Sequence, residues 1–114
     1  MTIERAVPNI KTNRVAETRA FFERLGFEAV MDLGWIVTVA SPDNPKAQVN
    51  IISEDPAAPG ISVEVGDVDA VHAQAVEHGL EIVYPLRDEE WGVRRFMLRE
   101  PGGTTVNVVS HRRG

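Results

Sequence analysis

The sequence contains no cysteine, which excludes disulfide bonds, thiolate chemistry and a cysteine-ligated zinc site. It also lacks a long hydrophobic run, since no segment approaches the roughly 18 apolar residues that a membrane span requires. The stretch MTIERAVPNIK carries charges where a signal peptide needs an apolar run. We therefore expect a cytoplasmic protein without a membrane partner.

Basic residues are outnumbered, with 12 Lys and Arg against 17 Asp and Glu, and the formal net charge is −5. A nucleic-acid interface needs clustered positive charge to displace counterions from phosphate, so we expect no nucleic-acid partner. The balance mildly favours cationic over anionic ligands, although solubility alone also explains it. An apolar fraction of 43% and a charged fraction of 25% in 114 residues are typical of one globular domain.

The chain carries an internal repeat. Gly26 and Gly79 are separated by 53 residues, as are Val30 and Val83, and both pairs follow a helical pattern. Later, VNI at 49–51 matches VNV at a spacing of 57, so the second copy contains four extra residues. We place those residues in PLRDEEWG, between two strands of the second copy.

Hydrophobic periodicity predicts the same element order in both copies: a strand, a helix and three strands. The first helix is expected at about 13–25 with Thr12 or Asn13 as its cap, and the second at about 67–78 with Asp67 as its N-cap. Strands are expected at about 7–12, 27–31, 35–40, 47–53, 61–65, 81–84, 93–98 and 104–110. Residues 1–114 would thus form one domain with modules at 6–53 and 61–111, joined by a linker at 54–60.

A doubled βαβββ unit with TRAFFERLGFE in its first helix, and EWGVRRFMLREPGG before its last strand, resembles the vicinal oxygen chelate superfamily. That superfamily contains glyoxalases, extradiol dioxygenases, fosfomycin-modifying transferases and bleomycin-resistance proteins. The resemblance covers nearly the whole chain. It implies an α+β fold in which two modules form a cup-shaped mixed sheet with helices on the convex face, and it implies a homodimer.

The resemblance also implies where a catalytic metal would be held, by one residue of the first strand and one of the last strand of each module. Counting back from the two helices reaches Val7 and Gly60, and the last strands offer Asn50 and Asn107. None of these is a usual ligand, because two positions lack a donor and two neutral amides bind hard cations weakly. We therefore expect neither a metal site nor another cofactor.

The three histidines do not replace the missing ligands. His72 and His78 lie on the second helix, diverge by about 120° around it, and should be on the convex side. His111 follows the last strand. We interpret all three as surface or rim histidines.

Strand alternation predicts which side chains line the cup. Lys11 belongs to that set, and the polar members expected to contact a ligand are Asn9, Gln48, Asn50, Ser62, Glu64, Arg95, Thr105 and Asn107. Such a surface suits ligand binding better than proton abstraction, although any one of these residues could simply be solvated. Glu64 could act as a general base if buried, but a salt bridge with Lys11 or Arg95 is the preferred interpretation.

The segment RDEEWG, residues 87–92, is a second candidate site because it places three carboxylates beside Trp91. An aromatic face with nearby acids favours a cationic or planar ligand. The alternative is that Trp91 packs at a dimer interface while the acids remain in water. Trp35 is a second candidate wall for a ligand.

These observations favour a metal-free, homodimeric protein that binds a small organic molecule, with antibiotic sequestration, as in bleomycin resistance, as the nearest model. The alternative is an enzyme with glyoxalase-, lyase-, epimerase- or dioxygenase-like activity, using a relocated metal or Glu64 as a base. A third hypothesis is a regulatory or assembly role without a ligand.

Overall fold

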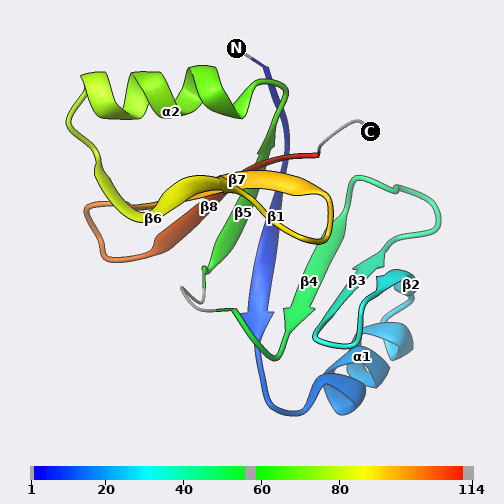
Figure 1. Ribbon diagram of the computed structural model, residues 1–114. Coiled ribbons are helices and arrows are strands. Elements are labelled where there is room, and N and C mark those ends of the chain that lie inside the picture. The colour runs from blue at the N-terminus through cyan, green and yellow to red at the C-terminus, as the bar shows by residue number, and fades with distance from the viewer. Residues whose placement is uncertain (1, 56–58, 112–114) are drawn as a thin grey trace. The chain divides into compact units, whose positions relative to one another are not determined.

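The computed structural model describes residues 2–55 and 59–111 and divides into two compact units (Figure 1). The N-terminal unit comprises Val7–Ala58, and the C-terminal unit comprises Met1–Ala6 together with Pro59–Gly114. Residues 56–58 of the predicted linker 54–60 lie outside the described residues, and the predicted module boundaries stay predictions.

The N-terminal unit has the predicted strand, helix and three strands. They are β1 (Ile3–Lys11), α1 (Val15–Arg24), β2 (Glu28–Asp32), β3 (Ile36–Ala40) and β4 (Gln48–Ile52). Strand β1 begins at Ile3, not at about Val7 as predicted, and its first residues belong to the C-terminal unit. The strand order is β2-β3-β4-β1, with β1 parallel to β4 and the other pairs antiparallel.

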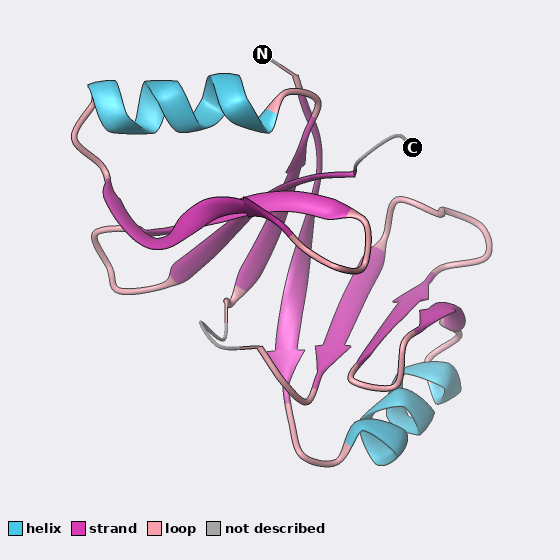
Figure 2. Ribbon diagram, in the orientation of Figure 1, coloured by secondary structure: helices cyan, strands magenta, loops and turns pink. Residues whose placement is uncertain are grey.

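The C-terminal unit repeats this order, with one helix and the corresponding strands (Figure 2). Its elements are β5 (Ile61–Val65), α2 (Val68–Glu77), β6 (Glu81–Asp88), β7 (Val93–Arg99) and β8 (Thr105–His111). The strand order is β5-β8-β7-β6, with β5 parallel to β8. The α+β class and the doubled βαβββ order are confirmed, and the cup stays a prediction.

The extra residues of the second copy are accommodated differently from the prediction. Strand β6 continues to Asp88, so the first half of PLRDEEWG is strand and only its end is a turn. The register of β6 against β7 shifts twice, between Ile82 and Tyr84 and between Tyr84 and Arg87. Such irregularities absorb additional residues without ending the strand, which is why a loop was wrongly predicted there.

Helix ends follow the sequence signals only in part. Asp67 caps α2 by accepting a hydrogen bond from the Ala70 amide, as predicted. Helix α1 begins later than predicted, with Arg14 at the N-cap position, and Thr12 Oγ1 accepts a bond from the Arg14 amide. Gly26 follows α1 with a φ of 108°, a left-handed conformation that glycine adopts without strain.

Each helix covers one face of its own unit's strands. In the N-terminal unit, Val15 and Phe22 of α1 pack on Val37, Val39 and Ile51. These apolar residues alternate along their strands with residues that point to the opposite face. That opposite face therefore presents the polar side chains that were predicted to bind a ligand.

In the C-terminal unit, α2 packs on Val65, Phe96 and Val108. The ring of His72 meets Phe96 edge-on, with 4.9 Å between the ring centroids. His72 is half-buried at the edge of this core, and its interpretation as a surface or rim histidine stays a prediction. Neither helix, within residues 2–55 and 59–111, is long and apolar enough to span a membrane.

Candidate functional site

A short row of polar side chains crosses the N-terminal unit on the face opposite α1. Thr38, Asn50 and Asn9 are register partners on β3, β4 and β1. The Thr38 hydroxyl donates to Asn50 Oδ1 at 2.6 Å, and Asn50 Nδ2 donates to Asn9 Oδ1 at 2.9 Å. The Asn50 amide therefore uses both its acceptor and its donor within the row.

The C-terminal unit carries the equivalent row on β7, β8 and β5. Its members are Met97, Asn107 and Ser62, which are register partners in the same way. Asn107 Nδ2 donates to Ser62 Oγ at 3.0 Å, as Asn50 donates to Asn9. The two rows confirm that the sequence repeat is also a repeat of strand register.

The two rows differ at one position. Met97 stands where the N-terminal unit has Thr38, and a thioether offers no hydrogen-bond donor. Asn107 is only 7% exposed, and its Oδ1 is a buried atom with no hydrogen-bond partner in the part of the chain that the structure describes. The asparagine oxygen of the C-terminal row therefore has no donor among the described residues, whereas the equivalent oxygen of the N-terminal row accepts a hydrogen bond from Thr38.

The four positions implied for a metal do not fit a divalent cation. Val7 is an apolar residue only 4% exposed. A Cβ added at Gly60 would lie 3.0 Å from Thr104 Cγ2, so a ligating side chain there would require Thr104 to shift. Asn50 and Asn107 supply only neutral amides, which cannot neutralise a buried divalent charge. Within the described residues, no group of three or more His, Asp and Glu could hold a metal ion.

Glu64 forms an ion pair, as preferred from the sequence, but the predicted partner was wrong. Arg5 Nε donates to Glu64 Oε2 at 2.6 Å, and His111 Nε2 lies 3.4 Å from the same oxygen. Arg5 was missed because β1 was predicted to begin after it. His111 is the last residue of β8, which brings it beside β5, where Glu64 lies.

The segment RDEEWG does not present three carboxylates together. Arg87 and Asp88 end strand β6, and a turn closed by the amide of Gly92 on the Glu89 carbonyl leads into β7. The Asp88 carboxylate pairs with Arg94 at 3.2 Å. Glu89 is buried, so the expectation that all these acids remain in water was wrong.

Glu89 lies at the centre of a buried cluster with Arg95 and Tyr84. Arg95 Nη2 lies 2.8 Å from Glu89 Oε2, and both side chains are only 4% exposed. The Tyr84 hydroxyl donates to the same carboxylate oxygen at 2.9 Å, and Arg87 Nε lies 2.7 Å from Oε1. A buried ion pair of this kind needs such additional bonds to offset its desolvation.

The guanidinium of Arg95 also lies between two aromatic rings. Its Cζ is 4.9 Å from the centroid of Tyr84 and 5.0 Å from that of Trp91. The cation that Trp91 contacts is thus a residue of this chain, where the sequence predicted a ligand. Trp91 nevertheless remains 41% exposed, which leaves part of its indole accessible.

The remaining predicted residues have the following positions. Gln48 Nε2 donates to the Pro45 carbonyl at 2.8 Å, within the turn before β4. Thr105 is half-buried at the start of β8, where its carbonyl accepts from the Gly60 amide at 2.9 Å. Trp35 is half-buried beside the turn between β2 and β3. Gln48 and Thr105 each lie two residues before the asparagine of their strand, and therefore on the same face as Asn50 and Asn107.

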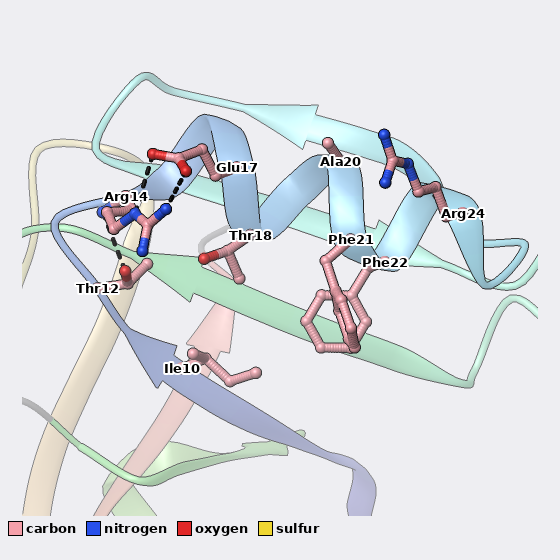
Figure 3. A pocket seen from close by; sticks show the side chains of 9 residues that line it. All are labelled: Ile10, Thr12, Arg14, Glu17, Thr18, Ala20, Phe21, Phe22 and Arg24. Carbon is pink, nitrogen blue, oxygen red and sulfur yellow. Dashed lines mark hydrogen bonds and ion pairs between the residues drawn. The ribbon is translucent and has the colours of Figure 1, made fainter.

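An open hollow of about 730 Å³ lies elsewhere in the N-terminal unit, beside α1. Figure 3 shows Arg14 and Glu17 paired at one end of it and the rings of Phe21 and Phe22 at the other. Its lining contains none of the predicted site residues. The charged residues of the lining include the ion pair of Arg14 with Glu17, and Phe22 also packs against the core of the unit.

Sequence reasoning missed four residues that shape these sites: Arg5, Thr38, Tyr84 and Glu89. Thr38 could have been found, because it lies in the β3 stretch IVTVA, flanked by two valines that face the helix. Glu89 gave no such signal, since an acid within DEE is typical of an exposed turn.

A family model of the Glyoxalase/Bleomycin resistance protein/Dioxygenase superfamily matches residues 5–108. Among curated proteins, none matches the chain.

Several solved structures are similar to the chain. NAD-dependent benzaldehyde dehydrogenase from Legionella pneumophila is 15% identical with a TM-score of 0.79, over 94% of this chain and 99% of that one. A glyoxalase/bleomycin resistance protein/dioxygenase superfamily member from Vibrio splendidus 12B01 is 20% identical with a TM-score of 0.72, over 96% and 99%. Methylmalonyl-CoA epimerase from Streptomyces coelicolor, in complex with 2-nitronate-propionyl-CoA, is 19% identical with a TM-score of 0.70, over 96% and 99%. At these identities the likeness shows the fold alone.

Proposed function

The chain belongs to the Glyoxalase/Bleomycin resistance protein/Dioxygenase superfamily, and from that premise we propose that it binds a small organic molecule without using a metal. The proposed site is the face of the C-terminal unit opposite α2. Its polar contacts would come from Ser62, Thr105 and Asn107, with Trp91 as the aromatic surface. Asn9, Gln48 and Asn50 of the N-terminal unit, and the ion-paired Glu64 and Arg95, remain proposed contacts of lower rank.

The observation that carries this proposal is the chemistry of the row around Asn107. Buried neutral groups that hydrogen-bond without carrying charge are the usual polar anchors of small-molecule sites. Ser62 and Asn107 are both buried and hydrogen-bonded to each other. The strong charges nearby are paired, since Arg95 binds Glu89 and Arg5 binds Glu64. The face therefore favours recognition over acid–base chemistry.

A thermal-shift screen together with elemental analysis tests the proposal. The panel would contain divalent metals, cationic glycopeptides, planar antibiotics and glutathione adducts. A ligand present at about 100 times its dissociation constant adds about 2.7 kcal/mol of stability, which raises the melting temperature measurably. We expect an organic compound to stabilise the protein and no transition metal to copurify. One tightly held metal per chain would contradict the proposal.

A second candidate is an epimerase- or lyase-like enzyme with Glu64 as its base. It is favoured by the 3.4 Å approach of His111 to Glu64 and by the fold shared with methylmalonyl-CoA epimerase. The 2.6 Å bond from Arg5 counts against it, because the same carboxylate oxygen is already engaged. Exchange of the acidic C–H of methylmalonyl-CoA for deuterium, lost in Glu64→Gln, would establish this alternative.

We further propose antibiotic sequestration by a cytoplasmic homodimer as the biological role. Light scattering on the purified protein would measure its mass against that of a 12.6 kDa chain. Expression in a sensitive host should raise the tolerated concentration of a compound that binds in the screen. A monomeric mass would contradict the proposed homodimer, and unchanged tolerance would contradict antibiotic sequestration.

A further inference from the structure

We propose that the carbonyl oxygen of Asn107 is the acceptor for an N–H or O–H donor of the ligand. The ligand would then be a neutral amide, alcohol or N–H heterocycle, and not a carboxylate or a phosphate. This inference rests on the proposed binding function and assigns the chemistry of its ligand.

The first support is the state of the Asn107 side chain itself. The residue is 7% exposed, its Nδ2 is bonded to Ser62 Oγ, and its Oδ1 has no partner among residues 2–55 and 59–111. A buried carbonyl without a donor costs free energy, and native proteins rarely keep one without a use. The orphaned acceptor is therefore a candidate anchor.

The second support comes from the repeat. In the N-terminal unit the corresponding oxygen, Asn50 Oδ1, receives the Thr38 hydroxyl at 2.6 Å. A threonine at position 97 would close Asn107 Oδ1 in the same manner, but the chain has Met97 there, with no exposed surface. At the same position of the strand register, the asparagine oxygen is hydrogen-bonded in the N-terminal unit and has no donor in the described part of the C-terminal unit.

The orientation of the amide follows from the same comparison. Asn50 directs Nδ2 to the partner on β1, and Asn107 directs Nδ2 to the partner on β5. In the N-terminal unit the oxygen meets Thr38 of β3, and in the C-terminal unit Met97 of β7 is the register partner at the equivalent position. The open group is consequently an acceptor, which attracts a donor and repels the oxygens of an anion.

The surrounding charges support a neutral ligand. The nearest cations of the same face, Arg95 and Arg5, are each held by a carboxylate, Glu89 and Glu64. Neither pair leaves a single dominant charge to select an ion. Tyr84, the register partner of Met97, extends the row with an aromatic ring for an apolar ligand body.

The test uses small probes that differ only in one donor. Indole is compared with 1-methylindole, and benzyl alcohol with benzyl methyl ether; benzoate serves as an anion that accepts but does not donate. Binding to the full chain is measured by chemical-shift titration of the ¹⁵N-labelled protein. The backbone amides of β7 and β8 beside position 107 are the reporters in every variant, and the Asn107 side-chain amide is an additional reporter in the unaltered chain. We expect each donor to bind about tenfold more tightly than its methylated partner, and benzoate to bind most weakly.

Asn107→Leu removes the acceptor at similar volume, so the ratio within each pair should fall to about one. A steric effect of the methyl group would persist in that variant, which separates it from a lost hydrogen bond. Asn107→Ala removes the acceptor with a smaller side chain and should also give a ratio of about one, so the test remains decisive if the leucine variant fails to fold. Asn13→Leu, at an exposed asparagine outside the proposed site, is the control and should leave the ratio unchanged.

Equal binding within the pairs, tighter binding of benzoate, or a preference that persists in Asn107→Leu would overturn the inference. Each of these outcomes leaves the proposed binding function standing. If none of the probes moves the Asn107 amide, the inference also fails. The proposed function fails separately, when the broader thermal-shift panel yields no ligand.

Discussion

The two units have the same strand order and register, but they use their polar residues differently. In the N-terminal unit, Thr38, Asn50 and Asn9 satisfy one another across three strands. In the C-terminal unit, one substitution of hydroxyl by thioether leaves Asn107 Oδ1 without a donor. The two rows thus share one register but differ in whether the asparagine oxygen has a donor, and the proposed ligand site rests on this difference.

The turns differ in the same sense. The turn between β2 and β3 is held by local bonds, such as the Gly34 amide on Asp32 Oδ1 at 2.8 Å. The turn between β6 and β7 instead buries Glu89 against Arg95 and places Trp91 over the guanidinium. The turn of the C-terminal unit thus combines a buried ion pair with an aromatic contact, whereas the bond described for the other turn is local.

The largest expected effect is in that ion pair. Glu89→Gln leaves the Arg95 charge buried without its counter-ion, and removal of one partner of a buried pair costs about 3–5 kcal/mol. Equilibrium urea unfolding should show this loss. The neighbouring exposed residue supplies the control, since Glu90→Gln should change the free energy of unfolding by less than about 0.5 kcal/mol. Similar small effects of both variants would show that the cluster does not hold the turn.

A smaller effect is expected when the N-terminal row is opened in the manner of the C-terminal one. Thr38→Val keeps the shape but removes the hydroxyl, so Asn50 Oδ1 loses its 2.6 Å donor. An unsatisfied buried carbonyl costs about 1–3 kcal/mol. The same exchange at the half-buried Thr105 should cost less than about 0.5 kcal/mol by urea unfolding. Equal losses of unfolding free energy at the two positions would mean that the hydrogen bond from Thr38 does not stabilise the row.

The smallest effect concerns the turn between β7 and β8. The amides of Thr104 and Gly102 donate to the Glu100 carboxylate at 2.8 and 2.7 Å, and these bonds lower the pKa of Glu100 below its ordinary value. Their stabilising contribution is thus present above the unfolded pKa and is lost as the pH falls through the lowered folded pKa.

An NMR titration of the Glu100 carboxyl carbon measures this pKa directly. Glu100→Gln should remove the corresponding pH dependence of stability. The equivalent turn of the N-terminal unit is held by Ser41 and Asn44. Because these side chains are neutral, that turn should contribute no pH dependence of stability. An ordinary pKa of Glu100 would contradict the role given to its two backbone hydrogen bonds.

Much of the fold could be predicted because duplication made the sequence informative twice. Equivalent glycines and the VNI and VNV stretches located the strands, and alternation placed Asn9, Asn50, Ser62 and Asn107 on one face of each unit. The strand β1 was predicted too short because ERA, residues 4–6, has the polarity of a solvated segment. That error removed Arg5 from consideration and gave Glu64 the wrong partner.

For the candidate site, the sequence predicted which residues share a face but not how they interact. Alternation identifies the residues of a face, but not which hydrogen bonds they form with one another. Whether the asparagine oxygen has a donor depends on a residue of the neighbouring strand, which is Thr38 for Asn50 and Met97 for Asn107. The sequence does not show that these residues are neighbours. Glu89 follows a strand whose register shifts twice against β7, and the sequence of that strand gives no local pattern that predicts these shifts.

The contrast between Asn50 and Asn107 is tested most directly by replacing each with leucine and measuring the free energy of unfolding. Asn50→Leu breaks two bonds of a satisfied row and should cost about 1–3 kcal/mol. Asn107→Leu removes one bond together with an unsatisfied buried carbonyl, so its cost should lie within about 1 kcal/mol of zero. A larger loss for Asn107→Leu than for Asn50→Leu would contradict the assignment of the open acceptor to the C-terminal unit.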